Sequence, residues 1–207
     1  MLSKQTIPNT LVFDIGRVLI EWDAEIPYRR LIPDEAERAA FFRDVLPPEW
    51  NLEQDRGRTW AEAEAEKIAL FPQHADLIRA WRQNWHETVP GDIPGNVAVL
   101  EAALAAGIPC YAITNFAADT FKEAQARFPF LTRFAGIVVS GEERLIKPDP
   151  AIFEVFLTRY GMRTGDCLFM DDSAANIATA QSLGFATIHV TEGMNLAAAV
   201  RAFGFAI

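Results

Sequence analysis

Short apolar runs rich in β-branched residues alternate with longer amphipathic segments along most of the chain. The runs, in chain order, are TLVFD, IPCYAI, FAGIVVS, DCLFMD and ATIHV. Runs of this length are typical of buried strands, and the segments between them have the apolar spacing of helices. Strands that alternate with helices predict a parallel sheet with crossover helices, so we expect an α/β protein.

Helices are expected between and after these strands, and two glycines mark where helices should stop. Gly107 and Gly184 each follow an amphipathic segment directly, at the position where glycine commonly ends a helix. The expected helices cover about 95–106, 117–127, 150–160, 173–183 and 195–203.

The pattern changes between residues 22 and 90. Segments such as PDEAERAAFFRDVL and TWAEAEAEKIAL have helical spacing, and this stretch has no clear strand pattern. Asp34 and Thr59 are predicted N-caps, and the proline pair in VLPPEW separates two helices. We therefore expect an all-helical cap domain at residues 22–90, inserted into a core domain made of residues 1–21 and 91–207. Its aromatic residues are expected to build its own core: Phe41, Phe42, Trp50, Trp60, Trp81 and Trp85. One or two of them are also candidates to line a substrate pocket, since sites form where two domains meet.

Composition and charge exclude several classes of protein. The chain has 207 residues, half of them apolar, which suffices for one core with a modest insertion. A net charge of −9 and the lack of a basic stripe argue against a nucleic-acid partner. No apolar leader or membrane-length run occurs, so a cytoplasmic protein without a membrane partner is expected. Cys110 and Cys167 lie in apolar runs and are expected to be reduced core thiols.

Polar residues follow the predicted strands at the points where chemistry is expected. In an open parallel sheet, ligands bind at the carboxyl ends of the strands. The residues near those ends or in adjoining loops are Asp14 after the first strand, Thr114 and Asn115 after the second, Lys147 in a loop before a helix, and Asp171 and Asp172 after the fourth.

These residue types together predict a phosphoryl-transfer site. Three carboxylates near one point repel each other, and a hard cation such as Mg²⁺, which prefers oxygen ligands, relieves that repulsion. A carboxylate not wholly used by the metal can attack phosphorus. The Thr114 hydroxyl, the Asn115 amide and the Lys147 ammonium can donate to the phosphoryl oxygens.

In their order and placement, these residues resemble the motifs of the haloacid dehalogenase superfamily of hydrolases. Asp14 matches the first-motif nucleophile, and Thr114 matches the second-motif hydroxyl. Lys147, in KPDPAIF, matches the third-motif lysine, and DDSAAN matches the acidic fourth motif. The resemblance covers nearly the whole chain. It implies a Rossmann-like, doubly wound parallel sheet with a helical cap inserted after the first strand.

The resemblance also implies a role for each matched residue. Asp14 would form a phosphoaspartyl intermediate, with Thr114 and Lys147 as further catalytic residues. Mg²⁺ would be held by Asp14, the backbone carbonyl of Gly16 and Asp172, with Asp171 as a helper. Asn176, one helical turn past the acidic pair, would orient the metal shell.

Gly16 departs from the pattern of most phosphatases in this superfamily. They carry at that position a second aspartate, which protonates the leaving group and later activates water. Loss of a positioned proton donor typically costs about 10²–10⁴-fold in rate. The chain resembles a branch with an Asp-x-Gly first motif, some members of which act on sugar phosphates, including anomeric phosphates.

Three interpretations of Gly16 follow. The leaving group needs little protonation, a cap residue supplies the proton, or the site binds without turnover. Glu21, Asp23 and His86 are candidates for a substitute acid, although solvated charge or simple packing also accounts for each of them. Arg17 either meets a substrate anion or faces solvent.

The leading hypothesis is a Mg²⁺-dependent phosphatase of a small-metabolite phosphomonoester, with a sugar phosphate as one candidate substrate. One alternative is a 2-haloacid dehalogenase that uses Asp14 on carbon. The acidic pair Asp171 and Asp172 argues against it, because unneutralised negative charge repels an anionic substrate. The other alternative is a non-catalytic binding protein that has kept the fold, for which Gly16 is the support.

Overall fold

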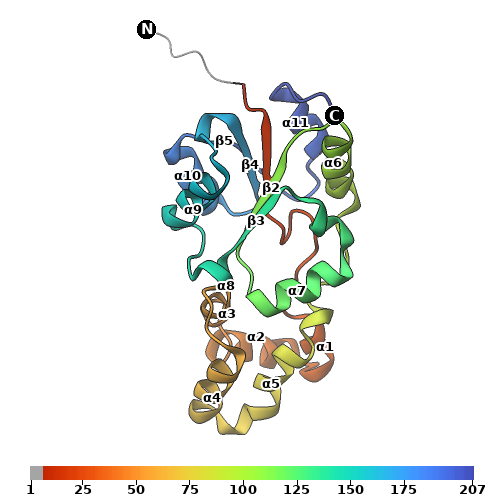
Figure 1. Cartoon of the computed structure of the whole chain (residues 1–207). Coiled ribbons are helices and arrows are strands. Elements are labelled where there is room, and N and C mark those ends of the chain that lie inside the picture. Colours follow the sequence, from red (N-terminus) through yellow and green to blue (C-terminus); the bar gives the residue numbers. More distant parts are fainter. Residues whose placement is uncertain (1–6) are drawn as a thin grey trace.

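The computed structural model describes residues 7–207. Its strands are β1 (Thr10–Phe13), β2 (Cys110–Thr114), β3 (Gly136–Val139), β4 (Cys167–Asp171) and β5 (Ala186–His189). They form one parallel sheet in the order β3-β2-β1-β4-β5 (Figure 1). This confirms the expected α/β class. Strands β2 and β3 are added on one side of β1, and β4 and β5 on the other. The switch point of the topology, where ligands bind in doubly wound folds, therefore lies between β1 and β4.

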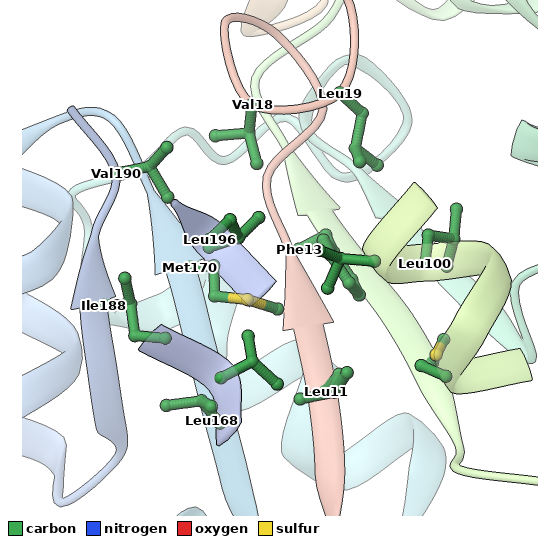
Figure 2. Packing of buried hydrophobic residues seen from close by; sticks show 14 of the residues in the cluster. Leu11, Phe13, Val18, Leu19, Leu100, Leu168, Met170, Ile188, Val190 and Leu196 are labelled. Carbon is green, nitrogen blue, oxygen red and sulfur yellow. The ribbon is translucent and has the colours of Figure 1, made fainter. Parts of the chain in front are cut away.

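Helices cover both faces of this sheet. Successive strand side chains point to opposite faces, so Leu11 and Phe13 belong to one apolar cluster and Val12 to another. The cluster of Leu11 and Phe13 also includes residues of α6 (Pro94–Ala105) and α11 (Leu196–Ala202). The cluster of Val12 includes residues of α9 (Pro150–Tyr160) and α10 (Ala174–Leu183). Figure 2 shows the first cluster closing over the central strands, with Leu11, Phe13, Leu168, Met170, Leu100 and Leu196.

The helix boundaries lie close to the expected ones. Gly184 ends α10 with a φ of +96°, a conformation in which a residue without Cβ is favoured. The expected helix at about 117–127 is α7 (Ala118–Arg127). Elements that the pattern does not predict are α8 (Ser140–Glu143) and 3₁₀ segments at Pro72–His74, Trp85–Glu87, Pro129–Arg133 and Thr164–Asp166. No helix within residues 7–207 has the length and apolar character needed to cross a membrane.

An all-helical segment is inserted after β1, as expected, and lies beyond one end of the sheet (Figure 1). Asp34 caps its second helix by accepting from the Glu37 N–H, and Thr59 forms a reciprocal capping box with Glu62. The placement of the domain boundaries at residues 22 and 90 stays a prediction. The helices are α1 (Ile26–Leu31), α2 (Glu35–Asp44), α3 (Pro48–Asp55), α4 (Trp60–Leu70) and α5 (Ala75–Gln83).

The aromatic residues of the insertion divide between two clusters. Most pack around Tyr28, whose ring centroid lies 5.0 Å from that of Phe42 and 6.3 Å from that of Trp81. Trp85 is an exception, because it packs 5.8 Å from Phe116 in a cluster with residues of the sheet. The prediction that Trp85 belongs to the cap's own core was therefore wrong: the chain has already returned to the sheet at this position.

Specific contacts join the cap helices to the carboxyl end of the sheet. The Ser140 hydroxyl at the start of α8 donates to the Asp55 carbonyl at the end of α3, over 2.6 Å. The Trp60 indole N–H donates to Asp119 of α7 over 3.1 Å, and Arg82 lies 3.4 Å from the same carboxylate. The cap is thus held over the strand ends at which the chemistry is expected.

Candidate active site

Asp14 projects from the carboxyl end of the central strand. Its backbone N–H continues the pairing with β4 by donating to the Met170 carbonyl, over 2.8 Å. Its side-chain Oδ1 accepts from the Ile15 N–H at 2.7 Å and lies 2.9 Å from the Lys147 Nζ. Both bonds fall on Oδ1, which leaves Oδ2 for the cavity that Asp14 lines.

Lys147 is buried between two carboxylates, with only 1% of its side chain exposed. Its Nζ lies 2.9 Å from Asp14 and 2.6 Å from Asp171. Asn115 fixes the loop that carries it: the Asn115 amide donates to the Lys147 carbonyl at 2.9 Å, and its oxygen accepts from the Lys147 N–H at 2.8 Å. The Asn115 amide nitrogen carries a second N–H, so its expected contact with a substrate stays a prediction.

Asp171 and Asp172 are neighbours with different surroundings. Asp171 is fully buried, and besides Lys147 it accepts from the Ser173 N–H at 2.8 Å and from the Asn176 amide at 3.0 Å. The side chain of Asp172 is 29% exposed, and its partner is Arg17, at 4.0 Å. Asp171 is thus held by the protein on several sides, whereas Asp172 is open to the cavity it lines.

The charges of the site do not balance. Burial raises the pKa of Asp14 to about 7, although Lys147 opposes the rise. Burial, with a contribution from Asp171, also raises the pKa of Asp172. Burial by itself would lower the pKa of Lys147, but the two carboxylates beside it outweigh this and raise it. The Lys147 ammonium and the more distant Arg17 guanidinium therefore face three carboxylates, and the remaining negative charge favours a further cation.

The three carboxylates are close enough to hold a metal ion together. Asp14, Asp171 and Asp172 each offer an oxygen, and these atoms lie within 4.8 Å of one another. An all-oxygen donor set is the kind that Mg²⁺ prefers, so the residues fit that ion. Gly16 lines the same cavity as Asp14 and Asp172, and the expectation that its backbone carbonyl also binds the ion stays a prediction.

Thr114 is an exception among the expected site residues, because it does not line the cavity. It ends β2 with no exposed surface, and its hydroxyl has no hydrogen-bond partner among the described residues. A buried hydroxyl without a partner costs free energy, about 1–3 kcal/mol in protein mutants. The sequence placed Thr114 at the correct strand end but did not reveal that its hydroxyl would be enclosed and unbonded.

A cavity of about 670 Å³ lies between the sheet and the cap. The sheet side contributes the polar residues Asp14, Arg17, Asn115, Lys147 and Asp172. The cap side and its hinges contribute a mostly apolar wall that includes Trp22, Phe42, Leu46, Leu52, Trp60, Trp81 and Trp85. The guanidinium of Arg17 lies 5.0 Å from the Trp22 ring centre, where these two surfaces meet.

The cap also brings in a carboxyl group that sequence reasoning missed. Asp55, the last residue of α3, lines the same cavity as Asp14. In the sequence it is one of several acids on the cap helices, and nothing in its spacing separates it from exposed neighbours such as Glu53. Its position depends on how the cap packs on the sheet.

The candidates for a substitute acid fall in less suitable places. Asp23 lines the cavity, but its carboxylate already accepts from Arg29 at 2.6 Å and from the Glu25 N–H at 2.8 Å. Glu21 does not line this cavity but an adjoining one, which shares Arg17 and Asp172 with it. His86 lines neither of these cavities and lies 4.0 Å from Glu87.

Known proteins resemble this chain over most of its length. A sesquiterpene phosphatase, astK, from Aspergillus oryzae is 26% identical over 88% of the chain and 90% of its own length. An enzyme of Bacteroides thetaiotaomicron, solved with magnesium and inorganic phosphate, has a TM-score of 0.69 at 24% identity, covering 90% of this chain and 96% of its own. L-2-haloacid dehalogenase of Xanthobacter autotrophicus has a TM-score of 0.66 at 16% identity, covering 93% and 81%. The two solved structures share the fold.

A family model provides the assignment. The model described as haloacid dehalogenase-like hydrolase matches residues 51–190, which includes β2 to β5 together with Lys147 and the acidic pair. Asp14 lies ahead of the matched segment. Because the match spans more than half of the chain, this protein belongs to the haloacid dehalogenase-like hydrolases.

Proposed function

We propose that this hydrolase is a Mg²⁺-dependent phosphomonoesterase that passes the phosphoryl group of a small metabolite to Asp14 and then to water. One observation carries the proposal. Asp14 lines a cavity beside two further carboxylates, and its Oδ1 is held by Lys147 and the Ile15 N–H, whereas its Oδ2 has no hydrogen bond among the described residues. This arrangement suits a nucleophile whose orientation is fixed while its reactive oxygen stays free.

The residues around Asp14 would divide the work. Asp14 Oδ2 attacks phosphorus, and Lys147 keeps the nucleophile ionised and offsets charge on the phosphoryl oxygens. The buried Thr114 hydroxyl gains a partner when a phosphoryl oxygen reaches it. Asp14, the Gly16 carbonyl and Asp172 would hold Mg²⁺, with Asp171 positioned behind them. When bound, Mg²⁺ supplies positive charge that reduces repulsion between the carboxylates and an anionic substrate.

The charge of the site favours phosphoryl transfer over dehalogenation. A 2-haloacid is an anion that must approach Asp14 past Asp171 and Asp172 without a metal to offset them. The likeness to L-2-haloacid dehalogenase, at 16% identity, concerns the fold. A cation bound near these carboxylates would also offset the negative charge of a phosphate ester.

The cavity wall supports a substrate with an apolar organic group. Trp22, Phe42, Trp60 and Trp81 face the space in which the leaving group of a phosphate on Asp14 would lie. Aromatic walls bind apolar and ring-shaped groups through buried area. The similarity to a sesquiterpene phosphatase agrees with this preference. Sugar phosphates remain candidates, because polar side chains such as Asn51 share the cavity.

The test is release of inorganic phosphate from a panel of phosphomonoesters that includes prenyl, aryl, sugar and acyl phosphates. Purified protein is first freed of metal with EDTA and then assayed with and without added Mg²⁺. We expect phosphate release only when Mg²⁺ is added. In Asp14→Asn the rate of phosphate release should fall at least about 10⁴-fold, the scale of loss when a nucleophile is removed.

A matched control is Asp149→Asn, which changes an aspartate near the site that caps α9 by accepting from the Ala151 N–H. It should keep the turnover of the parent protein. Phosphate release that survives metal removal, or that survives Asp14→Asn, would contradict the proposal. Chloride release from a 2-haloacid in the presence of EDTA would support the dehalogenase instead.

A further inference from the structure

Gly16, which stands where most related phosphatases carry an aspartate, has room for a larger side chain. A Cβ built on Gly16 meets no atom within 4 Å, and Gly16 lines the cavity beside Asp14. Packing therefore does not explain the glycine. A phosphatase that breaks an unactivated ester at this site needs a proton donor from elsewhere on the cavity wall.

Asp55 is the cap carboxyl that the fold presents to that cavity. It lies at the end of α3, where the Ser140 hydroxyl of the sheet domain anchors its carbonyl over 2.6 Å. The Asn51 amide donates to its Oδ2 over 3.2 Å and orients the side chain, and the Ala117 N–H is near enough to favour the charged carboxylate. No cation forms an ion pair with Asp55 among the described residues. Asp14 is close enough for its charge to act on Asp55.

The other acids on this wall are already paired with cations. Asp23 accepts from Arg29 at 2.6 Å, and Glu25 accepts from Arg38 at 3.1 Å. A carboxylate in an ion pair is stabilised in its charged form and is a poor proton donor. Asp55 differs from both in lacking a cationic partner.

We propose that Asp55 of the cap is the general acid and base of this site, in place of the aspartate absent at Gly16. This assignment rests on the proposed phosphatase function. It makes α3 a catalytic element as well as part of the cap, and it places the proton donor on the opposite side of the cavity from the nucleophile.

The proposed reaction has two steps, and Asp55 transfers a proton in each. Asp14 Oδ2 forms a bond to phosphorus while the bond from phosphorus to the ester oxygen breaks, and the Asp55 proton moves to that oxygen to give the free alcohol. Water then attacks phosphorus of phospho-Asp14, the acyl phosphate bond breaks, and the Asp55 carboxylate takes a proton from the water. Inorganic phosphate, ionised Asp14 and protonated Asp55 result.

The surroundings of Asp55 agree with this cycle. Burial raises its pKa to about 7; the Ala117 N–H opposes the rise, and the charge of Asp14 adds to it. A carboxyl whose pKa is near neutral can both give and take a proton at physiological pH.

The experiment compares two esters of similar size whose leaving groups differ in their need for a proton. 4-Nitrophenyl phosphate releases a stable phenolate, whereas 4-nitrobenzyl phosphate would release a strongly basic alkoxide. We expect Asp55→Asn to lower kcat/KM for the benzyl ester by about 10²–10⁴-fold, while kcat/KM for the phenyl ester falls less than about tenfold. The kcat/KM ratio is used because it reports the first step and excludes hydrolysis of phospho-Asp14.

Two further variants separate catalysis from structure. Glu53→Gln changes an exposed acid on the same helix, paired with Arg56 at 3.5 Å, and should leave both esters unaffected. Gly16→Asp places an acid in the open space beside Asp14. In the double variant Gly16→Asp/Asp55→Asn, kcat/KM for the benzyl ester should be at least about tenfold higher than in Asp55→Asn alone.

The outcomes distinguish the two proposals. Equal losses for both esters in Asp55→Asn, with parental thermal stability, would overturn the role of Asp55 while leaving the phosphatase intact. The role would also be overturned if the parent protein hydrolysed the benzyl ester no faster than Asp55→Asn. Activity that persists in Asp14→Asn would instead remove the phosphatase proposal itself.

Discussion

The sheet domain and the helical cap contribute to the cavity in opposite ways. The sheet domain supplies buried charge: Asp14 and Asp171 at strand ends lie 2.9 Å and 2.6 Å from the Nζ of Lys147, which comes from a loop. The cap supplies aromatic surface, held by ring contacts such as that of Trp50 with Trp81 at 5.5 Å. Charge at fixed strand ends suits an invariant phosphoryl group, whereas an apolar wall suits a variable organic group. Most of the charged groups of the cavity therefore come from the sheet domain and most of its apolar wall from the cap, with Asp55 as a charged exception on the cap side.

Loss of Lys147 should have the largest effect on the sheet side of this comparison. Lys147→Met leaves Asp14 and Asp171 buried without their shared ammonium, and breaking a buried ion pair in this way costs about 3–5 kcal/mol. We expect the free energy of unfolding, measured in urea without metal, to fall by that amount. Lys122→Met, which changes an exposed lysine of α7, is the matched control and should change it by less than about 0.5 kcal/mol.

The same free energies of unfolding, measured again with added Mg²⁺, test whether the carboxylates bind the ion. If the carboxylates hold the ion, Mg²⁺ should stabilise Lys147→Met more than the parent protein, because the variant carries more uncompensated negative charge. An unchanged free energy of unfolding in Lys147→Met would show that the ion pair does not stabilise the sheet side. Equal stabilisation of both proteins by Mg²⁺ would count against a shared role of Lys147 and the metal.

Thr114 should separate stability from activity. Thr114→Val removes a buried hydroxyl that has no partner, so the free energy of unfolding should stay the same or rise by up to about 1–3 kcal/mol. The kcat/KM for phosphate esters should fall about 10- to 150-fold, because a hydrogen bond to a charged group is worth about 1.5–3 kcal/mol.

The control is Thr88→Val, in which the lost hydroxyl donates to the Trp85 carbonyl at 2.7 Å. That variant should lose about 0.5–1.5 kcal/mol of stability and keep its kcat/KM. If Thr114→Val kept full activity, its hydroxyl would have no part in holding the phosphoryl group.

Substitution of Trp60 should have the smallest effect of these changes, and it should alter only the binding of the organic group on the cap side. It lines the cavity, and its ring centroid lies 5.9 Å from that of Trp50. Aromatic contacts of this kind contribute about 0.5–1.5 kcal/mol, so Trp60→Ala should raise KM for an aryl or prenyl phosphate about 2- to 10-fold. The inhibition constant of inorganic phosphate should stay constant, because that anion binds at the sheet side.

The matched control is Leu70→Ala, which removes an exposed apolar side chain at the end of the same helix. It should change neither constant. A parallel rise in KM and in the phosphate inhibition constant after Trp60→Ala would break the division between a phosphate side and an organic side.

More of the site residues on the sheet side than on the cap side could be predicted from the sequence. Asp14 and Asp172 could be placed because apolar runs identify strands and topology brings strand ends together, whereas Lys147 was placed by its resemblance to the family's third motif. The same logic did not show that Asn115 pins the Lys147 loop or that the Thr114 hydroxyl is enclosed. Those features depend on side-chain contacts between segments that are distant in sequence.

On the cap side, the sequence predicted helices and N-caps but not what the helices present to the cavity. The capping box of Thr59 is local, since its partner Glu62 lies three residues away. The position of Asp55 is not local, because it is anchored by Ser140, 85 residues further along the chain. Trp85 likewise packs on the sheet although the helical pattern continues close to it.

The sequence by itself determined the α/β class, the helical insertion and the strand-end residues, because periodicity and strand-end placement are encoded over short stretches. Only the tertiary structure decided that Asp55 shares a cavity with Asp14, that Lys147 lies between two carboxylates, and that aromatic rings form the opposite wall. Packing of the cap on the sheet sets these relations, and packing depends on the shapes of distant segments rather than on local pattern.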